Sequence, residues 1–187
     1  MLFQKFQQDF GNWTSGNEYI DKLIQESQLN ARGYFELLDW IPYNRLRNIQ
    51  FLAQGGFSTI YKSFWIDGPV LRWDYEKQSN EKYGFSVALK NLNDSSNISV
   101  GITQDPDTLN YMIVMPNAHN GSLRNNLKIK KYNPSDKFHN LWFISRQLES
   151  IHKLNLIHGD FHNGNILYLD YKYPMISDLG LCRPVNQ

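Results

Sequence analysis

The residues best able to do chemistry lie in the stretch HGDFHNGNIL, residues 158–167. Asp160 is followed by Asn165 five positions later, and Asp178 ends a further apolar run, in MISDLG. A carboxylate near an acceptor hydroxyl, with an aspartate and an asparagine that can hold Mg²⁺, is a side-chain set used for phosphoryl transfer. An aspartate in a stretch rich in glycine and asparagine can also do no more than cap a turn. The spacing of the three side chains favours the chemical interpretation.

A second candidate region is the glycine-rich stretch LAQGGFSTIYK, residues 52–62, between two runs that alternate as strands do. Without a Cβ, glycine lets backbone N–H groups approach phosphate oxygens closely. The later run FSVALK ends on Lys90, which could reach phosphates held by such a loop. Taken alone, the loop is equally well explained as a hairpin with a Gly-Gly turn, and a lone strand lysine is usually solvated. The pairing of loop and lysine favours phosphate binding.

The glycine-rich loop, V-A-L-K, H-G-D with its asparagine, and D-L-G, in this order, resemble the signature segments of eukaryotic protein kinases. The resemblance covers roughly residues 48–183, with some likeness to the tyrosine-kinase-like branch. It implies an α+β fold, in which an antiparallel β lobe precedes the first helices of a mainly helical lobe, with ATP in the cleft. The predicted parts are a helical extension and connector (1–47), a β lobe (48–115), a hinge (116–118) and a partial helical lobe (119–187).

The resemblance also implies a role for individual residues. Asp160 is the expected catalytic aspartate, and Lys90 and Asn165 complete the catalytic set. Asn165 and Asp178 are the expected Mg²⁺ ligands, and Met115 corresponds to the gatekeeper of the nucleotide site. Further contacts to ATP are expected from the loop, the residue facing the adenine and the hinge, namely Ala53, Gly55, Gly56, Phe57, Ser58, Ala88, Pro116 and Ala118.

Several positions depart from the kinase pattern. Ala53 and Ser58 stand at the first and third glycine positions, where small residues can be accommodated. Gly159 replaces an arginine that in kinases binds a phosphorylated activation loop, so switching by phosphorylation is not expected. Between Lys90 and Tyr111 the sequence has no glutamate and no helical pattern, so the helix that supplies a partner for the lysine is expected to be missing. Misplacing a reacting group by about 1 Å can cost on the order of 10²-fold in rate.

After D-L-G only LCRPVNQ follows, so we expect the activation segment and the later helices of a kinase to be missing. The helical pattern around residues 138–151 predicts an apolar stripe that would pack on such helices. We therefore expect an impaired enzyme that is marginally folded or oligomeric, with a protein partner on this stripe. The stripe consists of Phe138, Leu141, Ile144, Leu148 and Ile151.

Three functions remain open. The first is a protein kinase that transfers the γ-phosphate of ATP to Ser, Thr or Tyr hydroxyls of a protein in intracellular signalling. The second is an inactive pseudokinase, or a nucleotide-binding interaction fragment. The third is a small-molecule kinase of the aminoglycoside or choline phosphotransferase type, which Gly159 and His162 favour. His158 is expected to be a buried structural histidine rather than an acid or a base.

The remaining sequence narrows the class of protein. Lys plus Arg number 19 and Asp plus Glu 18, so the net charge of +1 indicates neither a nucleic acid nor a membrane as partner. A lone cysteine, Cys182, and an N-terminus without a signal peptide lead us to expect an intracellular, cytoplasmic protein. Near the N-terminus, a capped helix and a connector over residues 30–47 are expected. The expected caps are Thr14 and Ser15, and the expected apolar stripe of this helix is Ile20, Leu23, Ile24 and Ser27.

Overall fold

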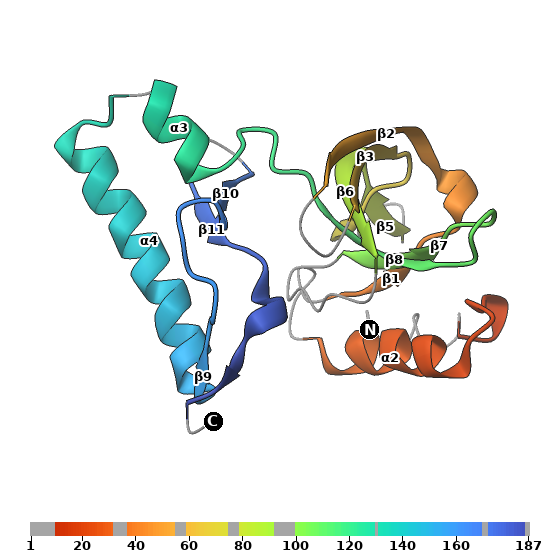
Figure 1. Ribbon diagram of the computed structural model, residues 1–187. Coiled ribbons are helices and arrows are strands. Elements are labelled where there is room, and N and C mark those ends of the chain that lie inside the picture. The colour runs from red at the N-terminus through yellow and green to blue at the C-terminus, as the bar shows by residue number, and fades with distance from the viewer. Residues whose placement is uncertain are drawn as a thin grey trace. The chain divides into compact units, whose positions relative to one another are not determined.

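The computed structural model describes residues 10–31, 37–54, 59–74, 79–91, 100–129, 131–169 and 172–185 (Figure 1). The chain divides into two compact units, one of residues 1–94 and 99–116, the other of residues 95–98 and 117–187. The first contains a six-stranded sheet, and the second contains a long helix with two short strand pairs. The predicted α+β class is confirmed. In the described part of the chain, no helix is long and apolar enough to cross a membrane.

The sheet of the first unit has the strand order β1-β7-β8-β6-β3-β2, and every neighbouring pair is antiparallel except β1 with β7. A separate antiparallel hairpin consists of β4 (Val70–Asp74) and β5 (Ser79–Lys82). The sheet strands are β1 (Asp39–Trp40), β2 (Leu46–Gln54), β3 (Thr59–Trp65), β6 (Phe85–Asn91), β7 (Gly101–Gln104) and β8 (Tyr111–Pro116). Two short 3₁₀ helices accompany them, η1 (Phe10–Asn12) and η3 (Tyr43–Arg45).

The core of the first unit is built on its central strands β6 and β8. Val87 and Leu89 of β6 and Val114 of β8 are completely enclosed. They pack with the apolar side chains of neighbouring elements, among them Trp65 and Met112. Burying one side chain of this size stabilises a fold by about 1.5–3 kcal/mol. The core thereby fixes strand β6, which carries two of the residues expected to contact ATP.

Helix α2 (Glu18–Asn30) is capped by Asn17 and not by the predicted Thr14 or Ser15. The side-chain oxygen of Asn17 accepts a hydrogen bond from the backbone N of Tyr19 at 2.9 Å. Thr14 and Ser15 instead donate their hydroxyl hydrogens to Asp21, one turn into the helix. The prediction was wrong because serine, threonine and asparagine all cap helices well, so the sequence does not distinguish among them.

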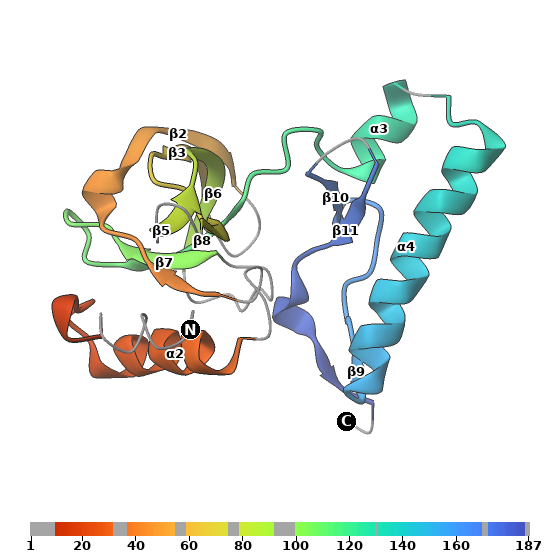
Figure 2. The same cartoon turned by 180° about the vertical axis from the view of Figure 1, so that it is seen from behind.

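Helix α2 lies along the β1 and β7 side of the sheet (Figure 2). Its buried side chains are Ile20, Ile24 and Gln28. The amide of Gln28 donates to the carbonyl oxygen of Leu38 at 2.9 Å, which ties the helix to the residue before β1. Leu23 of the predicted stripe is 49% exposed, so the inner face is narrower than predicted and includes a polar side chain.

Strand β1 lies in the stretch that was predicted to be a connector. Asp39 pairs with Gly101 and Trp40 pairs with Ile102, in parallel. A Cβ at Gly101 would meet the side chain of Ile41 and lie 2.6 Å from the carbonyl oxygen of Asp39. The close approach of β1 therefore requires glycine at position 101. A strand of two residues has no alternation that a sequence pattern could reveal.

The second unit begins with helix α3 (Leu123–Ile129) and helix α4 (Pro134–Lys153). Asn133 caps α4, since its side-chain oxygen accepts from the backbone N of Asp136 at 2.8 Å. Two antiparallel pairs follow, β10 (Ile166–Tyr168) with β11 (Pro174–Ile176) and β9 (Leu156–Ile157) with β12 (Arg183–Pro184). The 3₁₀ helix η4 (Leu179–Leu181) lies between β11 and β12.

The apolar residues of α4 are shared between two faces, which corrects the predicted exposed stripe. Ile144 is buried against Ile166 and Ile176, and Leu148 and Ile151 pack beside it. These three side chains therefore belong to the core over β10 and β11, Ile144 buried and the other two partly buried. The residues that do face solvent are Phe138, Leu141 and Trp142, at 75%, 63% and 57% exposure. The sequence pattern combined both faces because their positions overlap at a spacing of three and four residues.

Candidate active site

The turn over residues 158–160 requires the glycine at its centre. Gly159 has φ of +79°, a backbone conformation that is strained for residues with a Cβ. A Cβ at this position would strike the carbonyl oxygen of Leu181 and lie 3.0 Å from the carbonyl carbon. No side chain, and in particular no arginine, fits at position 159 while the turn keeps this form.

His158 holds this turn in place from inside the second unit. It is 3% exposed, and its Nε2 lies 3.0 Å from the carbonyl oxygen of Ser177. Its Nδ1 accepts a hydrogen bond from the backbone N of Asp160 at 3.3 Å. Because Nδ1 is an acceptor, the ring proton sits on Nε2 and is donated to Ser177. The expectation that His158 is a buried structural histidine is confirmed.

Asp160 and Asn165 are joined directly. The amide Nδ2 of Asn165 donates to the carboxylate Oδ2 of Asp160 at 2.9 Å and to the backbone oxygen of Asp160 at 3.0 Å. No further hydrogen bond to the Asp160 carboxylate is found in the described residues, and the side chain is 42% exposed. The Oδ1 atom is thus available to an approaching hydroxyl.

Asp178 lies at the same end of the β10–β11 pair as Asn165, because the strands are antiparallel and Ile166 pairs with Ile176. Between them, Ser177 donates its backbone N–H and its hydroxyl to the carbonyl oxygen of Asn165, at 2.8 and 3.0 Å. Asp178 itself adopts the left-handed conformation, with φ of +62° and ψ of +61°. The backbone before Asp178 is therefore pinned to Asn165.

The donor atoms at this end suit Mg²⁺ that arrives with a nucleotide. The amide NH₂ of Asn165 is used on Asp160, so its Oδ1 is the atom left to ligate a cation, and Asp178 follows at the same end of the strand pair. In the described residues no group of three or more His, Cys, Asp and Glu could hold a metal ion unaided. Mg²⁺ usually takes one or two protein oxygens together with phosphates and water, so this sparse set fits it.

In the first unit, the sheet register positions the residues expected to contact ATP. Ala88 of β6 pairs with Met115 of β8, and Lys90 pairs with Ile113 on that strand and with Ile60 on β3. Ala88 is 7% exposed and Lys90 is 6% exposed. The alternative interpretation of Lys90 as a solvated strand lysine is therefore wrong.

The glycine-rich segment joins two paired strands. Ala53 of β2 pairs with Ile60 of β3, and Gln54 pairs with Thr59. Residues 55–58, which include the expected Gly55, Gly56, Phe57 and Ser58, lie outside the described residues. Of the expected hinge, Pro116 ends β8, and Ala118 accepts a hydrogen bond from the backbone N of Gly121 at 2.9 Å.

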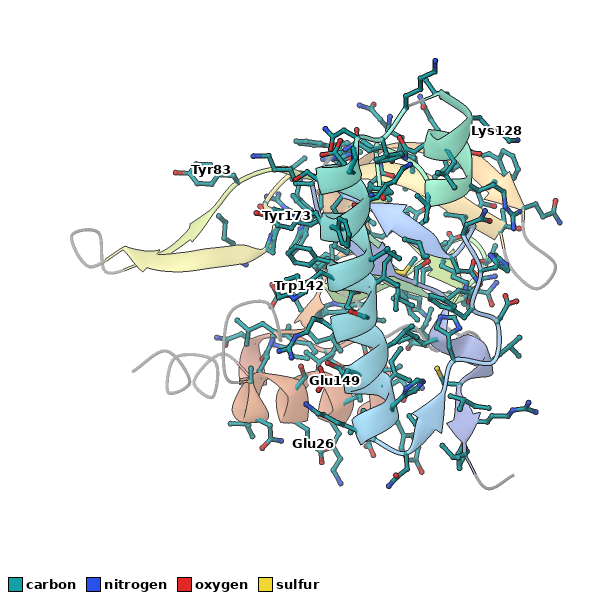
Figure 3. The ribbon with its side chains drawn as sticks, turned by 90° about the vertical axis from the view of Figure 1, so that its left-hand side faces the viewer. Glu26, Tyr83, Lys128, Trp142, Glu149 and Tyr173 are labelled. Atoms are coloured by element: carbon teal, nitrogen blue, oxygen red, sulfur yellow. The ribbon has the colours of Figure 1, made fainter. Side chains whose placement is uncertain are left out.

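The interval after Lys90 contains strand β7 and a turn over its described part, residues 100–110. Residues 92–99 lie outside the described residues. The helix that does pack on this sheet is α2, but its glutamates Glu18 and Glu26 are both exposed, and Figure 3 shows Glu26 on the outer side of α2. Helix α2 therefore covers the sheet without offering a glutamate to it.

A comparison with known protein families finds a match. Residues 46–187 match the family described as protein tyrosine and serine/threonine kinase, a span that covers most of the chain. The chain belongs to the protein kinase family. Helix α2 and strand β1 lie before residue 46, where the match to the kinase family begins. A comparison with curated proteins finds no match.

The loop over residues 158–165 also has contacts that were not predicted from the sequence. Arg124 of α3 donates from Nε to the side-chain oxygen of Asn163 at 3.0 Å, and its backbone N donates to the Asn163 carbonyl at 2.9 Å. His162 lies between this arginine and Asp160. The one sequence signal for these contacts is Gly164, placed directly before Asn165.

Proposed function

We propose that this kinase chain binds ATP with Mg²⁺ and transfers the γ-phosphate to a Ser, Thr or Tyr hydroxyl of a protein. The observation that carries the proposal is the bond from the Asn165 amide to Asp160, which leaves one carboxylate oxygen for the acceptor. We further propose that it acts in intracellular signalling in the cytoplasm, where ATP is available.

In the proposed reaction, Oδ1 of Asp160 takes the proton of the acceptor hydroxyl. The bond from the acceptor oxygen to the γ-phosphorus forms while the bond from the γ-phosphorus to the β–γ bridging oxygen breaks, and ADP leaves. Asn165 and Asp178 would hold Mg²⁺, and the ion would supply positive charge for the phosphate oxygens. Asn165 would thus have two tasks, since its NH₂ orients Asp160 and its Oδ1 would be available to the cation.

The first unit supplies the nucleotide contacts in this proposal. Lys90 binds the α- and β-phosphates, and the loop with Ala53 and residues 55–58 covers the phosphates. Ala88 and Met115 contact the adenine, with Pro116 and Ala118 at its edge. Support for this arrangement comes from the burial of Lys90 and Ala88 on one rigid strand.

A second candidate is a pseudokinase that binds nucleotide without transferring phosphate. It is favoured by one observation: the described residues after Lys90, 100–110, form a strand and a turn, and the glutamates of α2 face solvent. Transfer requires the reacting groups to be aligned to within about 1 Å, whereas binding tolerates larger displacements, so a nucleotide can bind at such a site without reacting.

Radiolabelled transfer from ATP distinguishes these candidates. The purified chain is incubated with γ-labelled ATP and Mg²⁺ and, in separate reactions, with a mixed protein acceptor, an aminoglycoside and choline. We expect label only on protein, and a loss of at least about 10²-fold in Asp178→Asn because one metal ligand is weakened.

The other outcomes are equally definite. Nucleotide binding without transfer to any acceptor would establish the pseudokinase. Label on the aminoglycoside or choline alone would establish a small-molecule kinase, the function that Gly159 and His162 favour by resemblance.

A further inference from the structure

His162 is held by hydrogen bonds to a single ring nitrogen. The backbone N–H groups of Gly164 and Asn165 both point to its Nδ1, at 3.0 and 3.2 Å. The Nη2 atom of Arg124 lies 3.5 Å from the same nitrogen. Backbone amides and guanidinium groups can only donate hydrogen bonds, so Nδ1 must be an acceptor.

This pattern fixes where the ring carries its proton. With Nδ1 used as an acceptor, the neutral imidazole of His162 must carry its hydrogen on Nε2. Nε2 lies 3.6 Å from Oδ2 of Asp160. That distance is longer than a hydrogen bond, but catalytic hydrogen bonds are often long before substrate binds and tighten in the complex.

One side of the partly exposed ring is closely approached by the backbone of its own loop. A Cβ on Gly164 would lie 2.8 Å from Cε1 and 2.9 Å from Nδ1 of His162, and 3.1 Å from the guanidinium carbon of Arg124. The loop can therefore wrap this closely around the imidazole only because residue 164 is glycine. Arg124 is in turn fixed by its two hydrogen bonds to Asn163.

The consequence for Asp160 is a difference between its two oxygens. Oδ2 faces the NH₂ of Asn165 and the Nε2–H of His162, whereas no hydrogen bond to Oδ1 is found within the described residues. On the proposed function, Oδ1 is the atom that receives the proton of the acceptor hydroxyl. We infer that His162 is a positioning residue, whose Nε2–H holds Oδ2 and thereby directs Oδ1 of Asp160 to the acceptor.

Two substitutions separate this role from a merely structural one. Asparagine at position 162 keeps an acceptor where Nδ1 stands but has no group that reaches Asp160. Glutamine keeps a donor near the place of Nε2 but loses the acceptor for the Gly164 and Asn165 amides. His152→Asn, at the exposed end of α4, is the control for the loss of a histidine.

Steady-state kinetics with Mg-ATP and a peptide acceptor, and thermal melts, are measured on each variant. If His162 positions Asp160, His162→Asn loses about 10- to 100-fold in kcat with little change in either KM, and its melting temperature stays near that of the parent. His162→Gln keeps a kcat about 10-fold above that of His162→Asn although its melting temperature falls. The reverse order, with asparagine near the parent in both measurements and glutamine impaired in both, would overturn the inference.

NMR keeps the inference testable without catalysis. In chain labelled with ¹⁵N-histidine at pH 8, where imidazoles are ordinarily neutral, we expect the His162 proton on Nε2 and a changed Nε2 shift in Asp160→Asn. A proton on Nδ1, or an Nε2 shift that ignores Asp160→Asn, would refute the contact. If these signals appear as expected while the parent transfers no phosphate, the proposed function fails and the contact with Asp160 stands.

Discussion

The two units of the chain hold their candidate site residues in different ways. In the first unit, Ala88, Lys90 and Met115 stand on strands whose register and buried core fix them. In the second unit, Asp160 and Asn165 stand in an irregular loop that is held by bonds between side chains and backbone. A regular strand spreads its support over many contacts, whereas the loop depends on single residues. Substitutions should therefore lower stability through the core in the first unit and through single backbone contacts in the second.

The largest loss of stability is expected from Leu89→Ala in β6. Leu89 stands between Ala88 and Lys90 along the strand, its side chain is completely buried, and its removal leaves a cavity in the core of the first unit. We expect the free energy of unfolding, measured with urea, to fall by about 2–5 kcal/mol.

Phe51→Ala on β2 is the matched control, because its ring is 63% exposed and lies in the same sheet. A loss for Leu89→Ala no larger than that for Phe51→Ala would contradict the claim that a buried core fixes β6.

Gly159→Ala should lower stability through a single backbone contact of the loop. The backbone φ of +79° and the contact with the Leu181 carbonyl both oppose a Cβ, so we expect a loss of about 1–3 kcal/mol in the urea melt. Gly16→Ala, with φ of +80° and nothing within 4 Å of the added Cβ, isolates the backbone strain. Equal losses in the two variants would show that the Leu181 contact has no effect.

The two units can also be compared through their helix caps, because an asparagine caps a helix in each. Asn17 caps α2 in the first unit and Asn133 caps α4 in the second, each through its side-chain oxygen. Replacing either by alanine should lower the free energy of unfolding by about 1 kcal/mol. Hydrogen exchange should show the opening confined to the first turn of the helix concerned, and protection lost across the other unit would contradict two separate units.

The smallest effect is expected from Asp39→Asn and depends on pH. Burial raises the pKa of the Asp39 carboxyl above 3.8, although Lys82 opposes this. A raised pKa in the folded chain means that stability is greatest below the unfolded value and decreases as the pH rises through the folded value. Asparagine cannot ionise, so thermal melts should show Asp39→Asn more stable than the parent at pH 7 and the gain disappearing towards pH 3.

Asp21→Asn should behave in the opposite way. Burial raises the pKa of Asp21, but hydrogen bonds from Ser15 and Thr14 outweigh it and lower the pKa below 3.8. Its contribution is present above the unfolded pKa and lost as the pH falls through the folded pKa. The variant should therefore be less stable at pH 7, with the deficit disappearing in acid. The same sign for both variants would contradict this account of the two carboxylates.

The sequence predicted the parts of the molecule that leave a pattern. The order of strands and helices followed from periodicity, whereas the kinase family and the burial of His158 followed from the resemblance of the motifs to those of protein kinases. Strand β1 was not predicted because two residues show no alternation. Its one trace in the sequence is Gly101, which allows the backbone of β1 to lie close to β7. The exposure of Phe138 and Leu141 was not predicted, because a spacing of three and four residues fits both the buried and the exposed face of α4.

In the candidate site, too, the residues were predicted and their contacts were not. The sequence placed Asp160, Asn165 and Asp178 at fixed spacings, but their contacts depend on which donor meets which acceptor. The ring of His162 is held by two backbone N–H groups and by an arginine of helix α3. Every residue except proline has a backbone N–H, so the residue types do not show which of these groups bind His162. These contacts could therefore not be predicted from the sequence.

Phosphate transfer by Asp160→Asn tests most directly whether Asp160 is the catalytic aspartate. Asparagine keeps the size of the side chain but removes the base, so Mg-ATP binding, measured by titration calorimetry, should remain within about threefold of the parent. Transfer to a protein acceptor should fall by about 10²- to 10⁴-fold, the range that a positioned general base contributes. Undiminished transfer by Asp160→Asn would contradict the assignment of Asp160 as the catalytic aspartate of this kinase.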